Sequence, residues 1–96
     1  MSFIQIIELQ THRFDEIEQL RDAWMAETEG QRTLVGSRVV LDRDRTNSYM
    51  VIAEFASFED AMVNSGLPAT QRFAEAIAPL LDAPPVFRNL DVVRVE

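Results

Sequence analysis

Residues 48–61 read SYMVIAEFASFEDA, and within this stretch the periodicity changes from that of a strand to that of a helix. Up to Phe55 the side chains alternate between two faces, and neither face is polar throughout. Ser57 then stands at the N-cap of a helix, and Asp60, three residues later, takes the place of the glutamate of a capping box. The stretch therefore predicts a strand over 48–55 that passes through one short turn into a helix.

The flanking segments extend this unit into a complete α+β domain. In chain order we expect a strand (3–10), a helix (14–29), a strand (33–42), a polar turn (43–47), a strand (48–55), a helix from 58 that is interrupted at 64–68, and a strand (86–95). Apolar residues recur at helical spacing in the first helix, and Gly30 is its natural end. The order βαββαβ predicts a ferredoxin-like fold, an antiparallel four-stranded sheet with both helices on one face.

The sheet is expected to need a partner. The strands carry apolar side chains on both faces, whereas two helices cover only one. We therefore expect a homodimer in which the uncovered faces of two sheets pack together. Some polar residues would then lie in the inner layer: Glu8, Arg38, Glu54 and Arg88. The alternative is a monomer whose apolar face is partly shielded by long side chains.

The interruption at 64–68 is the feature of the second helix most suggestive of a site. Pro68 suits the first position of a renewed helix, and the break leaves backbone groups that need other partners. Asn64 offers both a donor and an acceptor there, and Arg72 lies about one turn beyond Pro68. A ligand, including an anion, could satisfy these groups, and a purely structural kink is the alternative.

Three further side chains could carry chemistry. Trp24, the only tryptophan, lies on the apolar stripe of the first helix, where it either walls a pocket or packs in the core. Tyr49 either orients a ligand or completes a sheet edge. His12, the only histidine, is expected to be a solvated loop residue, with a catalytic role as the alternative. No spacing of histidines and carboxylates indicates a metal site.

Composition limits the partners. The 96 residues form a single domain, 1–96, and the formal net charge of -7 argues against nucleic acid and anionic membranes. There is no cysteine, which excludes disulfides and thiolate chemistry. No apolar run approaches the roughly 18 residues of a membrane span, and no signal peptide is evident, so we expect a cytoplasmic protein.

On these residues the chain resembles the dimeric α+β barrel superfamily, most closely its antibiotic-biosynthesis-monooxygenase-like group. The resemblance rests on the βαββαβ order, the sheet with two apolar faces and the stretch 48–61. It implies a homodimer with a pocket in each subunit between helices and sheet. Some members oxidise aromatic polyketides or quinols with oxygen and without a cofactor, in a pocket of tryptophan, tyrosine, asparagine and arginine, which here suggests Trp24, Tyr49, Asn64 and Arg72 as substrate-binding residues.

Other members of the superfamily degrade haem with a histidine on the second helix and a polar residue in the first strand. Here Phe73 stands in the comparable region and the first strand contains Ile4-Gln5-Ile6-Ile7, which counts against haem. No cofactor is therefore expected.

Several functions remain open. The first is a cofactor-independent monooxygenase acting on an aromatic or polyketide-like molecule, and the second is a non-catalytic dimer that binds a small molecule or is purely structural. An RNA-recognition domain shares the element order but needs basic and aromatic residues that the strand over 48–55 lacks. An amino-acid-sensing domain also shares the order, although it is usually fused to an enzyme.

Overall fold

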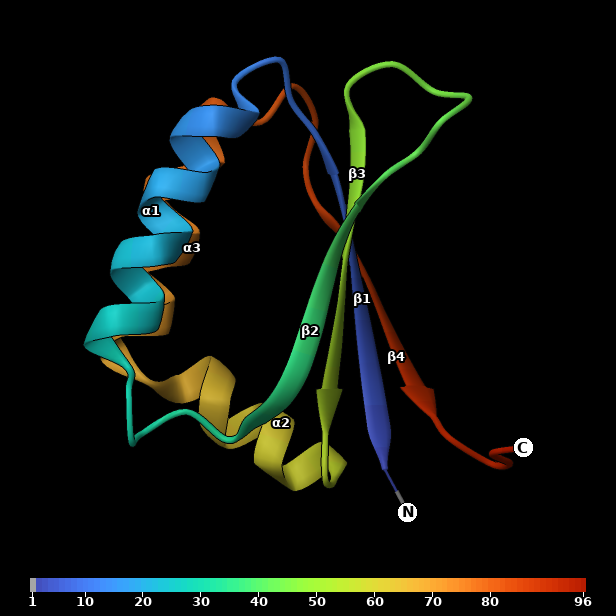
Figure 1. Cartoon of the computed structure of the whole chain (residues 1–96). Helices are drawn as coiled ribbons and strands as arrows, with labels where there is room; N and C mark the ends of the chain where they lie inside the picture. Colours follow the sequence, from blue (N-terminus) through green and yellow to red (C-terminus); the bar gives the residue numbers. More distant parts are fainter. Residues whose placement is uncertain (1) are drawn as a thin grey trace.

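The computed structural model describes residues 2–96 and shows a four-stranded sheet with a layer of helices on one side (Figure 1). The elements are β1 (Phe3–Gln10), α1 (Phe14–Glu27), β2 (Leu34–Leu41), β3 (Ser48–Phe55), α2 (Phe58–Gly66), α3 (Pro68–Ile77), a 3-10 turn (Ala78–Leu80) and β4 (Val86–Asp91). The predicted α+β class, element order and interrupted second helix are confirmed, and β1 and β3 have the predicted bounds.

The strands follow the order β2-β3-β1-β4, and every neighbouring pair is antiparallel. In the centre of the sheet Ile6 lies opposite Ile52 of β3 and Arg88 of β4, and Ile52 lies opposite Arg38 of β2. Both long helices, α1 and α3, lie side by side over the same face (Figure 1). The sheet thus has one face under helices and one face open.

The core lies where α2 meets the end of the sheet. Phe3 and Phe55 are each 2% exposed, and they pack with Ala53 and Ala61. The Phe3 ring also meets the Phe58 ring edge to face, at 5.5 Å between centroids. Strand periodicity places Phe3, Ala53 and Phe55 on the helix side of the sheet, so this cluster fixes which face the helices cover.

The passage from β3 into α2 and α3 follows the local sequence. The Ser57 hydroxyl accepts a hydrogen bond from the Asp60 amide at 3.0 Å, which confirms the predicted N-cap. Leu67 is extended, with φ -62° and ψ 135°, because residues before proline avoid the helical region. Pro68 then begins α3 as its first residue, where its missing amide hydrogen costs nothing.

The structure shortens three predicted elements, of which β2, expected over 33–42, loses one residue at each end. The first helix was expected to reach Glu29 but ends at Glu27, followed by a turn in which Gly30 has φ +81°. The last strand was expected to reach Val95 but ends at Asp91, because its neighbour β1 begins at Phe3, the residue opposite Asp91. Beyond that point one more hydrogen bond joins the Val92 amide to the Ser2 carbonyl at 3.0 Å.

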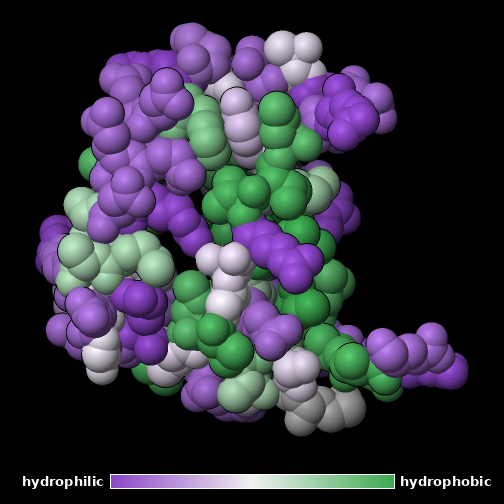
Figure 2. All heavy atoms as spheres, viewed as in Figure 1, coloured by the Kyte–Doolittle hydropathy of each residue, from purple (hydrophilic) through white to green (hydrophobic). Residues whose placement is uncertain are grey.

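The open face of the sheet is rich in apolar side chains. Strand alternation from the paired register assigns these apolar residues to it: Ile4, Ile6, Val40, Met50, Ile52, Val86 and Leu90. Glu8 and Arg88 form an ion pair on the same face at 2.9 Å. The four polar residues predicted for this layer therefore do lie on the open face, with Arg38 and Glu54 as the other two. In Figure 2 apolar side chains gather over the sheet, while the outer side of α1 is largely hydrophilic.

Among the described residues, no helix is both long and apolar enough to cross a membrane.

Candidate functional site

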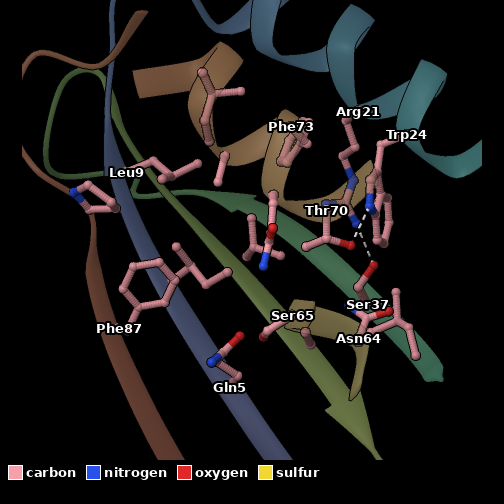
Figure 3. A pocket seen from close by; sticks show the side chains of 18 of the residues that line it. Gln5, Leu9, Arg21, Trp24, Ser37, Asn64, Ser65, Thr70, Phe73 and Phe87 are labelled. Atoms are coloured by element: carbon pink, nitrogen blue, oxygen red, sulfur yellow. Dashed lines mark hydrogen bonds between the residues drawn. The ribbon is translucent and has the colours of Figure 1, made fainter. Parts of the chain in front are cut away.

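A cavity of about 300 Å³ lies between the helix layer and the covered face of the sheet. All four strands and all three α-helices contribute to its lining, which is mainly apolar (Figure 3). The apolar lining includes Ile7, Leu9, Val51, Phe73, Ala74, Ile77 and Phe87. This volume lies at the lower end of the range of small-molecule sites, and such sites typically combine an apolar lining with a few placed polar groups.

Trp24 forms part of the wall and is held in place from two sides. Its indole Nε1 donates a hydrogen bond to the Thr70 hydroxyl at 2.9 Å, which ties α1 to α3. Its ring packs at a tilt against Phe73, with 6.1 Å between centroids. The Arg32 guanidinium lies 6.0 Å from the indole centroid in a cation–π arrangement. The indole is 7% exposed, so it is a fixed wall of the cavity.

Arg21, one turn before Trp24 on α1, is the one ionisable residue among those that line the cavity. Its Nη2 donates a hydrogen bond to the Ser37 hydroxyl of β2 at 2.7 Å (Figure 3). Burial lowers the pKa of Arg21, and Glu18 and Asp22 on the same helix oppose this effect. The guanidinium nevertheless remains protonated at neutral pH. The site therefore places one cation against an otherwise apolar lining.

Asn64, near the end of α2, adds a buried amide to the same cavity. The residue is 8% exposed, and its Oδ1 is buried without a hydrogen-bond donor among the described residues. A buried acceptor without a partner costs free energy, about 1–3 kcal/mol. A donor on a bound ligand or a water molecule would remove that cost.

Two of the four predicted site residues line the cavity, and two do not. Trp24 and Asn64 line it. The Tyr49 ring stacks on Phe14, the first residue of α1, with 4.0 Å between centroids and 3° between planes. Arg72 forms an ion pair with Glu27, the last residue of α1. Tyr49 and Arg72 therefore contact the two ends of α1 and stand outside the cavity lining.

His12, the only histidine, has a carboxylate partner that the fold brings to it from far along the chain. Its Nδ1 lies 2.8 Å from Asp82 Oδ1, across 70 positions of sequence. The His12 side chain is 67% exposed and does not line the cavity, as expected for a solvated loop residue. Within residues 2–96, no group of three or more histidines and carboxylates is placed to hold a metal ion.

Six polar residues of the cavity were not predicted as site residues: Gln5, Arg21, Ser37, Ser65, Thr70 and Gln71. Arg21 stands three residues before Trp24, and positions three apart share a helix face, so this spacing was an available signal. Ser37 and Thr70 gave no such signal, because a single hydroxyl in a strand or a helix has many roles.

No family model matches the sequence, and no curated protein matches it. Solved structures do share its architecture. One from Caulobacter crescentus, named as a candidate antibiotic biosynthesis monooxygenase, is 17% identical with a TM-score of 0.84, and the match covers 97% of this chain and 91% of that one. The chain has the fold of the antibiotic biosynthesis monooxygenase domain proteins.

Two more structures with this monooxygenase-domain fold match over nearly their whole length. SnoaB from Streptomyces nogalater, a cofactor-independent oxygenase, is 18% identical with a TM-score of 0.81, over 98% of this chain and 95% of that one. A Mycobacterium tuberculosis protein is 13% identical with a TM-score of 0.81, over 99% and 98%. Identities this low establish a common fold, and the activity has to be argued from the site.

Proposed function

We propose that this chain is a cofactor-independent monooxygenase acting on an aromatic or polyketide-like small molecule. The observation that carries the proposal is the apolar cavity of about 300 Å³ with Arg21, Asn64 and Trp24 in its lining. A flat molecule of two or three rings matches such a lining in size and polarity. The fold shared with SnoaB, a cofactor-independent oxygenase, adds support.

The reaction suited to this site is oxidation of an activated ring carbon by molecular oxygen. A CH₂ group of an anthrone-like ring loses two hydrogens and gains one oxygen atom as a carbonyl, and the second oxygen atom leaves as water. The substrate supplies all four electrons, so the balance needs no other reductant. The protein supplies a mainly apolar site and fixes the orientation of the ring.

Within this proposal the four predicted residues divide into two pairs. Trp24 and Asn64 bind the substrate, Trp24 by packing against the ring and Asn64 by accepting a hydrogen bond at its buried Oδ1. Tyr49 and Arg72 support the site from outside by holding the two ends of α1, which carries Trp24. They are positioning residues rather than ligands of the substrate.

The proposed unit is a homodimer whose open sheet faces pack together. Support comes from the apolar residues of the open face and from the Glu8–Arg88 pair, which lets charged groups enter that layer with a partner. A soluble monomer rarely exposes so large an apolar patch. Each subunit keeps its own cavity on the opposite, helix-covered side of the sheet.

Asn64→Leu tests the proposal through oxygen uptake. With an anthrone or a naphthalene-type hydroquinone as substrate, we expect uptake by the wild type above the protein-free rate, and a roughly tenfold or greater loss in the variant. Stability should not fall, because leucine removes a buried acceptor that has no partner.

Met62→Leu, an exposed change on the same helix outside the cavity lining, is the control and should keep full uptake. Wild-type protein that consumes no more oxygen than Asn64→Leu across the panel would remove the monooxygenase from consideration.

One observation favours a second candidate, a dimer that binds a small molecule without turning it over. None of the residues lining the cavity is a carboxylate or a histidine, so no side chain there is an obvious proton acceptor. In a thermal-shift screen with the same compounds, stabilisation without oxygen uptake would identify this function.

A further inference from the structure

The polar end of the cavity is unusually rich in hydrogen-bond donors. The Ser37 hydroxyl accepts from Arg21, and the Thr70 hydroxyl accepts from Trp24, so both oxygens already have a donor. Neither hydroxyl hydrogen has an acceptor among the described residues, and both remain available. Figure 3 shows these four side chains gathered on one side of the cavity, opposite Phe87.

Arg21 makes this end cationic as well as donor-rich. No carboxylate forms an ion pair with it within the described part of the chain, and none lines the cavity. The charged groups that influence it are Glu18 and Asp22 on its own helix and Arg32 beyond its end. The Ser37 contact occupies one of five guanidinium hydrogens. A half-buried cation with donors to spare favours an anionic oxygen as its partner.

We propose that the cavity takes its ligand as an anion, an aromatic molecule whose ionised carboxylate, phenolate or enolate oxygen lies against Arg21, Ser37 and Thr70. This deepens the proposed function and rests on the same cavity. The net charge of the chain, -7, repels anions at long range, so selection of an anion has to come from this local group. Arg21 is thereby the residue that determines specificity.

A ligand that binds as an anion also explains how the site could work without a side chain that accepts a proton. A phenol or enol that enters as its anion has already given its proton to water, and Arg21 holds the ionised form in the apolar surroundings. The anion is the electron-rich form that reacts with oxygen, so the same contact that selects the ligand activates it. Asn64 is left to receive a hydrogen bond from a neighbouring hydroxyl of the ligand.

A pair of isosteric ligands tests the inference without any need for turnover. We expect 2-naphthoate to bind the wild type more tightly than neutral 2-naphthamide by roughly tenfold or more in a calorimetric titration. Arg21→Met keeps an unbranched apolar stem and removes the charge, and it should abolish this preference while leaving naphthamide affinity within about threefold. Arg21→Lys should restore part of it.

Arg43→Met is the matched control, because it removes one positive charge from an exposed turn outside the cavity. It should keep the preference for naphthoate in full. Equal affinities of the wild type for both ligands, or a preference that survives Arg21→Met, would overturn the inference. Naphthamide binding shows that Arg21→Met is folded. A preference for the anion without oxygen uptake would refute only the proposed monooxygenase activity. Oxygen uptake without the preference would refute only the inference that the ligand binds as an anion.

Discussion

Ile52→Arg is expected to convert the protein from a dimer into a folded monomer of 11.0 kDa. Ile52 lies on the open face in the centre of the sheet, opposite Ile6 on one side and Arg38 on the other. In the proposed dimer this position meets the second sheet, and a guanidinium there would be buried next to that of Arg38. The desolvation penalty is several kcal/mol, and the positive charge of Arg38 directly opposite adds repulsion.

Sedimentation at micromolar concentration measures this change directly. The wild type should sediment at twice the chain mass and Ile52→Arg at the chain mass. Val63→Arg is the control, because Val63 is an exposed apolar residue of α2, away from the open face, and this variant should remain dimeric. A wild type that sediments as a folded 11.0 kDa species would refute the dimer, as would a dimeric Ile52→Arg.

Ala74→Leu is expected to abolish ligand binding and oxygen uptake without harming the fold. Ala74 lines the cavity from α3, and leucine is nearly as good a helix former as alanine. The three added carbons would occupy space that a ring needs. Ala74 is itself exposed within the cavity, so the added carbons are only partly buried and the free energy of unfolding should not fall. We expect ligand affinity to fall by about a hundredfold or more.

Ala76→Leu on the same helix is the control, because it makes the same substitution outside the cavity lining. Ala76 is exposed and does not line the cavity, so its leucine variant should bind and consume oxygen like the wild type. Chemical denaturation gives the stabilities, and oxygen uptake gives the activity. If Ala74→Leu retains wild-type uptake while being well folded, the reaction takes place elsewhere.

The sequence was informative about the sheet because apolar residues recur on both faces of its central strands. The predicted strand bounds agree with the structure where turn and cap residues mark them, as at Ser48 and Phe55 of β3. The end of β4 could not be predicted, because Val92 to Val95 have strand-like composition although the pairing ends at Asp91, opposite Phe3. Local propensity cannot show where a neighbouring strand ends.

The site was less predictable, because its residues come from segments far apart in the chain. Trp24 and Asn64 stood out as a rare residue and as the residue at a helix break. Arg72 stood out for its place after Pro68, yet its helix turns it toward Glu27, and Arg21 supplies the cation instead. Which of several arginines meets the cavity depends on helix rotation and packing, which sequence spacing alone leaves open.

Occupation of the cavity by a small aromatic molecule can be followed directly through the single tryptophan of the chain. Trp24 is in the cavity wall, so a quinone or naphthoate bound there lies in contact with its ring. Titration with 2-naphthoate, corrected for absorbance, should quench Trp24 fluorescence along a saturable curve in the wild type and Ala76→Leu, and should lose saturation in Ala74→Leu. Weak, linear quenching of equal slope in all three proteins would contradict the account.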